Sequence, residues 1–308
     1  MKKAVKIVMA LLVLSSTLFA LSNNELAITI DLSGKQRMLT QKMTKEAFLI
    51  KLNIDKENNI KKLTESSQLF DKTLKGLIEG NKKLKLTAVE DKKIQTQLTK
   101  IVSIWNPFYT EIKNIINEKG NEKTYSIIDS KNSELLKEMN IAVELYAKQD
   151  KKSDFVLIND MNLAGKQRML LQKMAKSLLV LNKEDFITSQ KLFTRTLKGL
   201  KDGDKELKLK GTKLSSITKQ LKVIDTLWTQ AEKEFETALL GKNSKSVIVT
   251  LDKISEEMDK TVKLYAESLN RQRQRYEFAS LIKIYTSLEK MDNQTRLLLE
   301  KLAKVEIE

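Results

Sequence analysis

The chain contains neither cysteine nor histidine. Without cysteine it can form no disulfide and carries no thiol nucleophile. Without histidine it lacks the commonest general base and the commonest metal ligand. No phosphate-binding glycine loop occurs, and the carboxylates form no distinctive cluster; Glu256, Glu257 and Asp259 look like an ordinary solvated helix face. We therefore expect no enzymatic activity, no cofactor and no metal site.

Residues that break helices are also scarce. Pro107 is the only proline, and nine glycines are spread over 308 residues. Charged residues, mostly lysine and glutamate, make up 31% of the chain, and hydrophobic residues at 41% can supply a substantial core. This composition favours helices over strands and predicts an all-α protein.

The first 22 residues have the pattern of a secretory signal peptide. Lys2, Lys3 and Lys6 precede a short apolar run, and the small residues Ala20 and Ser22 are placed as at a cleavage site. The alternative is an uncleaved membrane anchor, but the apolar run is short for a spanning helix. We expect residues 1–22 to be removed and the mature chain to be soluble in the periplasm.

The chain carries a strong positive charge. Its formal net charge is +16, which becomes +13 when the three lysines of the signal are lost. Such a charge attracts anions, although lysines interspersed with acids can also form an ordinary solvated surface. Export argues against nucleic acid as a partner.

Four sequence blocks occur twice and in the same order. LSGKQRMLTQKM begins at Leu32 and LAGKQRMLLQKM at Leu163. They are followed by LFDKTLKGL and LFTRTLKGL, then by segments that end in tryptophan, and last by MNIAVELYA and MDKTVKLYA. The chain is therefore a tandem duplication.

Each copy has the periodicity of four amphipathic helices with short connections, which predicts two antiparallel four-helix bundles. The second helix of each copy ends at a glycine, Gly80 or Gly203, suited to closing a helix. We expect bundles over residues 25–150 and 151–268. No helix breaker follows Ser244, so residues 269–308 are expected to continue the last helix as a C-terminal extension.

The sequence leaves the arrangement of the two bundles open. Between Asn121 and Ala164 there is no glycine or proline, so the copies could share one long helix and stack end to end. A hairpin within AKQDKKSD would instead lay them side by side. Stacked bundles would bring each motif arginine against its equivalent in a second chain, as a homodimer.

The repeated motif places chemistry on one helix face. Gly34, Arg37 and Gln41 are spaced by three and four residues, and Gly165, Arg168 and Gln172 repeat the pattern. A glycine inside a helix costs roughly 1 kcal/mol relative to alanine, and the arginine fork suits a planar oxyanion. We expect these six residues to bind a ligand. The alternative is structural: a glycine at a close helix crossing and a surface arginine paired with glutamate.

SGKQRMLTQKM and AGKQRMLLQKM resemble the signature of the PilJ-like sensory domain of type IV pilus chemoreceptors, which is related to the extracellular domain of NarX-type nitrate sensors. LFDKTLKGLIEG resembles the second helix of that family. The resemblance implies a sensory bundle in which Arg37 and Arg168 contact a nitrate- or nitrite-like anion beside Gly34 and Gly165.

Two functions remain open at this stage. One is an exported module that binds a small anion and signals to a separate membrane-bound receptor or kinase. The other is a periplasmic structural or adaptor bundle without a small-molecule ligand.

Overall fold

The computed structural model describes residues 23–149 and 155–305. The proposed signal peptide lies outside the described residues. Two compact units are present: the chain up to Ala266 forms one, and Glu267–Glu308 forms the other. The larger unit contains both copies of the repeat, whose separate domain boundaries remain a prediction.

The first copy folds into four long helices, as the sequence predicts. They are α2 (Asn23–Lys51), α3 (Lys56–Glu79), α4 (Lys92–Ile116) and α5 (Glu122–Ala147). A single 3-10 turn, η1 (Lys82–Leu84), lies in the lysine-rich connection. Asp91 and Asn121 accept hydrogen bonds from the first free backbone N–H groups of α4 and α5, which explains where these helices begin.

The second copy repeats this order. Its helices are α6 (Phe155–Leu179), α7 (Lys183–Asp202), α8 (Ser215–Leu239) and α9 (Ser244–Val305). Helices α3 and α7 both stop at a glycine with positive φ, 84° at Gly80 and 100° at Gly203. Throughout the described residues the structure is helical apart from turns and isolated bridges, which confirms the all-α class.

Equivalent aromatic pairs fill the two cores. The ring centroids of Phe70 and Trp105 lie 4.2 Å apart, and those of Phe193 and Trp228 lie 4.2 Å apart. All four side chains are buried. Both copies therefore pack their second and third helices in the same way, which is the structural counterpart of the sequence duplication.

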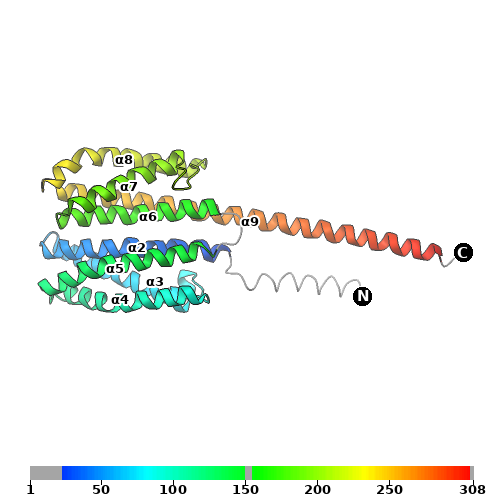
Figure 1. Ribbon diagram of the computed structural model, residues 1–308, viewed down its shortest axis with the longest axis horizontal. Helices are drawn as coiled ribbons and strands as arrows, with labels where there is room; N and C mark the ends of the chain where they lie inside the picture. Colours follow the sequence, from blue (N-terminus) through cyan, green and yellow to red (C-terminus); the bar gives the residue numbers. More distant parts are fainter. Residues whose placement is uncertain (1–22, 150–154, 306–308) are drawn as a thin grey trace. The chain divides into compact units, whose positions relative to one another are not determined.

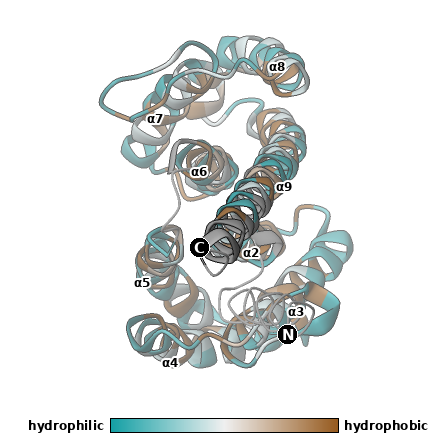
Figure 2. Cartoon of the chain, turned by 90° about the vertical axis from the view of Figure 1, so that its right-hand side faces the viewer, coloured by the Kyte–Doolittle hydropathy of each residue, from teal (hydrophilic) through white to brown (hydrophobic). Residues whose placement is uncertain are grey.

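The two bundles lie side by side. In Figures 1 and 2, α2 and α6 run next to each other through the middle of the larger unit, and the contacts between these two helices are extensive. Helix α5 ends at Ala147 and α6 begins at Phe155, so no single helix links the copies. The alternative of bundles stacked end to end is therefore wrong.

The smaller unit consists of the C-terminal part of α9. This helix is unbroken from Ser244 to Val305, in agreement with the lack of glycine and proline there. Across the described residues, no helix combines the length and apolar character needed to cross a bilayer.

Candidate functional site

The two motif arginines meet where α2 packs against α6. Arg37 is 3% exposed and Arg168 is 1% exposed, so both guanidinium groups are removed from water. Helical side chains lean toward the N-terminus of their helix. Each arginine accordingly reaches residues of the other helix that lie nearer its start, which links the two copies reciprocally.

Gly34 and Gly165 lie beside the two guanidinium groups. A Cβ atom at Gly34 would lie 3.4 Å from Nη2 of Arg37 and 3.8 Å from Nη2 of Arg168; at Gly165 the corresponding distances are 3.4 and 3.5 Å. No other group that could obstruct these positions comes within 4 Å. The glycines therefore border both arginines, and neither marks a close approach of two helix backbones.

Arg168 is held by two carboxylates from different helices. Its Nη2 donates to Asp31 of α2 at 2.9 Å, and its Nη1 donates to Asp259 of α9. Asp259 also forms an ion pair with Lys263, with 3.0 Å between Oδ2 and Nζ, and its Oδ1 lies 4.0 Å from Nζ of Lys35. The positive charge of Arg168 is thus neutralised within the protein.

The electrostatics of Asp259 reflect this position. Burial alone would raise the pKa of its carboxyl, but the charges of Arg168 and Lys35 and the hydrogen bonds from Lys263 and Arg168 outweigh burial. Together they lower the pKa to about 2. Asp259 therefore stays ionised and is a permanent counterion for Arg168.

Arg37 has no such counterion. Its Nη2 donates to Asn162, at 2.8 Å to the side-chain oxygen and 3.2 Å to the backbone carbonyl, while Nη1 lies 3.5 Å from the side-chain oxygen of Asn140. Its Nε is buried and has no hydrogen-bond partner among the described residues. The Nε of Arg168 is likewise unpartnered, so the two arginines differ in their other partners: those of Arg37 are all neutral amide oxygens.

The pKa of Arg37 shows the cost of this arrangement. Burial first, and then the charge of Arg168, lower it from 12.5 to about 9, and Glu144 opposes the shift only in part. Lys166, which is half-buried, also has a lowered pKa, caused by burial and by the charge of Arg37. At neutral pH Arg37 remains charged, and the region around it is positive.

The difference between the two arginines is a sequence difference between the copies. The position of Asp31 in copy one is Asn162 in copy two, and Asn140 in copy one is Asp259 in copy two. Each arginine bonds to the last helix of its own copy and to the first helix of the other copy. As a result, Arg168 is bonded to both aspartates and Arg37 to both asparagines. The duplication has produced one neutralised and one uncompensated arginine.

The two motif glutamines have other partners. Gln41 donates to Asn132 of α5 at 2.8 Å, and Gln172 donates to Asp252 of α9 at 2.8 Å. Both are buried. They tie the first helix of each bundle to its fourth helix, one turn beyond the arginine.

Sequence reasoning missed the partners of the arginines. Asp259 was expected on a solvated helix face, but it bonds to Arg168; that expectation is wrong because α9 packs close to both first helices. Asp31, Asn140 and Asn162 were likewise not predicted as part of the site. The exchange of acid for amide at equivalent positions of the two copies was the signal that could have found them.

The fold defines a class of protein: a duplicated all-α helical-bundle domain. The chain belongs to the family of the type IV pili methyl-accepting chemotaxis transducer N-terminal domain (PilJ), which matches residues 20–127 and 159–254. Members of this family are non-enzymatic sensory domains of chemotaxis transducers, typically periplasmic, that signal to other components. No curated protein matches the chain.

Proposed function

We propose that this sensory domain binds a small planar oxyanion, nitrate or nitrite in chemistry, at Arg37. The observation that carries the proposal is the unequal neutralisation of two equivalent arginines. Arg168 has two carboxylate partners, whereas Arg37 is equally buried and has only amide oxygens. A buried charge without a counterion is energetically costly. An anion that reaches Arg37 would provide the counterion that the protein itself lacks at this position, and its binding would therefore be favourable.

Asp31 and Asp259 indicate what such an anion would do. They present carboxylate oxygens to Arg168, and a carboxylate has the same planar arrangement of charged oxygens as nitrite and part of nitrate. A bound anion at Arg37 would therefore reproduce, from solution, the interaction that the second copy makes internally. The weakly bonded Nη1, which distinguishes Arg37 from Arg168, is the first donor available to it, and the unpartnered Nε, which both arginines have, is a second.

The other motif residues support this site in different ways. Gly34 and Gly165 keep the space beside the guanidinium groups free of side chains. Gln41 and Gln172 fix the spacing of the surrounding helices. Of the six residues expected from sequence, we therefore assign ligand contact to Arg37, Gly34 and Gly165.

Anion binding at this position offers a route to signalling. Arg37 lies between α2 and α6, the helices that join the two bundles, and its partners belong to α5 and α6. Neutralising its charge changes the contact between the bundles. We propose that a separate membrane receptor or kinase reads this change, as the resemblance to NarX-type sensors suggests.

The test is a thermal-shift screen of the mature protein with nitrate, nitrite, chloride and sulfate. A ligand that binds only the folded state raises the melting temperature. We expect nitrate or nitrite to raise it in the wild type and not in Arg37→Ala. If no planar anion alters the melting temperature of the wild type, the proposal fails.

One observation favours a second function, a structural adaptor. Lys45, which is 2% exposed, bonds to Asp252 across the two bundles, and Arg168 joins the same bundles through Asp31. Such bonds would hold a bundle pair together without any ligand. An adaptor would show no anion-dependent thermal shift.

A further inference from the structure

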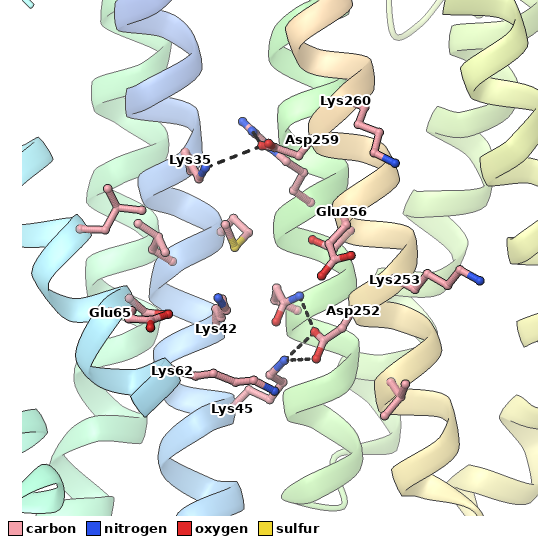
Figure 3. Close-up of a pocket in the computed structure, with 18 of the residues that line it drawn as sticks. Lys35, Lys42, Lys45, Lys62, Glu65, Asp252, Lys253, Glu256, Asp259 and Lys260 are labelled. Atoms are coloured by element: carbon pink, nitrogen blue, oxygen red, sulfur yellow. Dashed lines mark hydrogen bonds and ion pairs between the residues drawn. The ribbon is translucent and has the colours of Figure 1, made fainter. Parts of the chain in front are cut away.

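The larger unit also has a groove between α2, α3 and α9, with two residues of α6 in its lining and a volume of about 740 Å³. Figure 3 shows α2 and α3 on one side and α9 on the other. Two ion pairs cross from α2 to α9: Lys45 bonds to Asp252, and Lys35 lies 4.0 Å from Asp259. Within the described residues, no hydrogen bond or ion pair joins α2 to α9 between these two levels. A ligand can therefore enter there.

The wall formed by α9 is acidic. Asp252, Glu256 and Asp259 are spaced by four and three residues, so they share one helix face. In Figure 3 this face is turned toward α2, whereas Lys253 and Lys260 point away from the groove. Asp252 and Asp259 are already bonded to Lys45 and Arg168. Glu256 is exposed and has no ion pair in the part of the chain that the structure describes, so its carboxylate is available to a ligand.

The opposite wall supplies one cation without a counterion. Lys35 and Lys45 are paired with carboxylates of α9, and Lys42 lies 3.6 Å from Glu46 on its own helix. Lys62 on α3 is half-buried and pairs with no carboxylate of the described residues. In Figure 3 its side chain extends from α3 into the groove. Its ammonium group is therefore available to an anionic group of a ligand.

Gln172 of α6, which also lines the groove, has an unused acceptor. Its Nε2 donates to Asp252 at 2.8 Å, but its Oε1 is buried and has no partner among the described residues. The reason is chemical, because an ionised carboxylate only accepts hydrogen bonds and cannot donate one back. In copy one, Gln41 faces the amide of Asn132, which donates to Oε1 of Gln41 at 3.4 Å. Of the two motif glutamines, Gln172 alone thus leaves an acceptor that a donor of a ligand would satisfy.

We propose that this groove binds a small aliphatic zwitterion, an amino acid or a short peptide with a free ammonium and a free carboxylate group. The unpaired charges that line the groove have both signs, because Glu65 of α3 is present beside Lys62 and Glu256. Part of this set repels a ligand whose charge has only one sign, whereas a zwitterion complements both signs. The ammonium group of the ligand bonds to Glu256 and Gln172, and its carboxylate bonds to Lys62.

The rest of the lining indicates an aliphatic body for the ligand. The apolar side chains of the groove are Met38, Leu39, Leu69 and Val249. They offer surface that an aliphatic side chain removes from water, which favours binding. Arg37 does not line this groove. The site is therefore separate from the planar-anion site and does not depend on it.

The test is calorimetric titration of the mature protein with L-leucine and, in parallel, with the dipeptide leucyl-leucine, because both carry the pair of charges. Each is compared with its N-acetylated form, which lacks the ammonium group, and with its C-amidated form, which lacks the carboxylate. The variants are Glu256→Gln and Lys62→Gln, neither of which breaks an internal ion pair. The matched controls are Glu234→Gln and Lys222→Gln, which remove the same charges from exposed positions of α8.

We expect at least one of the two zwitterions to bind the wild type, and its blocked forms to bind about tenfold more weakly or worse. Glu256→Gln should weaken the zwitterion by a similar factor and leave the N-acetylated form unaffected. Lys62→Gln should weaken the zwitterion and leave the amidated form unaffected, and the α8 variants should bind as the wild type does.

Three results would overturn the proposal: no binding by the wild type, equal affinity for the zwitterion and its blocked forms, or equal losses in the groove and α8 variants. Arg37→Ala should leave this titration unchanged. The proposal for the groove and the proposal for the planar anion therefore fail independently.

Discussion

Lys45 in α2 donates to both carboxylate oxygens of Asp252 in α9, at 2.5 and 2.6 Å, and so joins the first bundle to the last helix of the second. The side chain of Lys45 is 2% exposed and that of Asp252 is 33% exposed. One end of this ion pair is therefore buried, and the other is reached by water. This makes the buried lysine dependent on its partner.

We predict that Asp252→Asn lowers the free energy of unfolding by about 2 kcal/mol, between the values typical of exposed and of fully buried pairs. Urea unfolding monitored by circular dichroism measures the change. Lys45→Met/Asp252→Asn should be less destabilised than Asp252→Asn alone, because the double variant leaves no unpaired buried charge. A double variant that is less stable than the single one would contradict this account.

A second prediction concerns acid stability. Burial raises the pKa of Asp160 from 3.8 to about 6, and the charge of Lys210 opposes this only in part. The folded state therefore holds a proton that the unfolded state releases, so this residue's contribution to stability falls as the pH rises from about 4 to 6. Asp160→Asn should flatten that part of the pH profile and raise stability at pH 7 by about 1 kcal/mol. Parallel unfolding curves at pH 4 and pH 7 measure the difference, and an unchanged difference would argue against a protonated Asp160.

Asp259 should behave in the opposite way. Its pKa in the folded state is about 2, lower than the ordinary 3.8, so it stabilises the fold above about pH 4 and loses that contribution as the pH falls toward 2. Asp259→Asn should reduce stability at pH 7 and weaken the loss on acidification. Thermal unfolding at a series of pH values checks both statements. Equal acid sensitivity of variant and wild type would contradict the ion pair with Arg168.

Gly34 allows a test of why glycine occurs in the motif. A methyl group there would make ordinary contact with both guanidinium groups, at 3.4 and 3.8 Å, and alanine gains roughly 1 kcal/mol of helix propensity. Gly34→Ala should therefore be as stable as the wild type or more stable, yet bind nitrate more weakly because the space beside Arg37 is filled. Loss of stability would instead indicate that the glycine serves helix packing.

Much of this fold follows from local sequence patterns. Helix ends were predictable because caps and periodicity act over short distances. They include the ends of α3 and α7 at Gly80 and Gly203 and the start of α9 at Ser244. The equivalence of Trp105 and Trp228 was predictable in the same way. The duplication was visible because the same blocks recur in order.

The side-by-side arrangement and the partners of the arginines were not predictable. Both depend on which apolar faces pack together, and the first helix of each copy is buried nearly all round, so its pattern does not identify one partner. Asp259 could be assigned to Arg168 only once α9 was known to approach α6. The spacing within a motif cannot provide contacts between distant helices.

Arg168 provides a matched counterpart to Arg37. Asp31→Asn/Asp259→Asn would give Arg168 amides in place of both carboxylates, as Arg37 has. We expect this double variant to bind nitrate at a second site, and the stoichiometry in calorimetry would show it, whereas Asp31→Asn alone, which keeps Asp259, should bind as the wild type does. A stoichiometry of one in the double variant would contradict the role assigned to the two carboxylates.

The central claim is that Arg37 lacks a carboxylate and therefore takes an anion from solution. It is tested most directly by nitrate calorimetry on Asn162→Asp, which gives Arg37 the internal counterion that Asp31 gives Arg168. The account predicts that the wild type binds nitrate at one site and that the variant, with unchanged helical content, binds it about tenfold more weakly or worse, since a loss of about 1.4 kcal/mol has that effect. Unchanged nitrate affinity in Asn162→Asp would contradict the account.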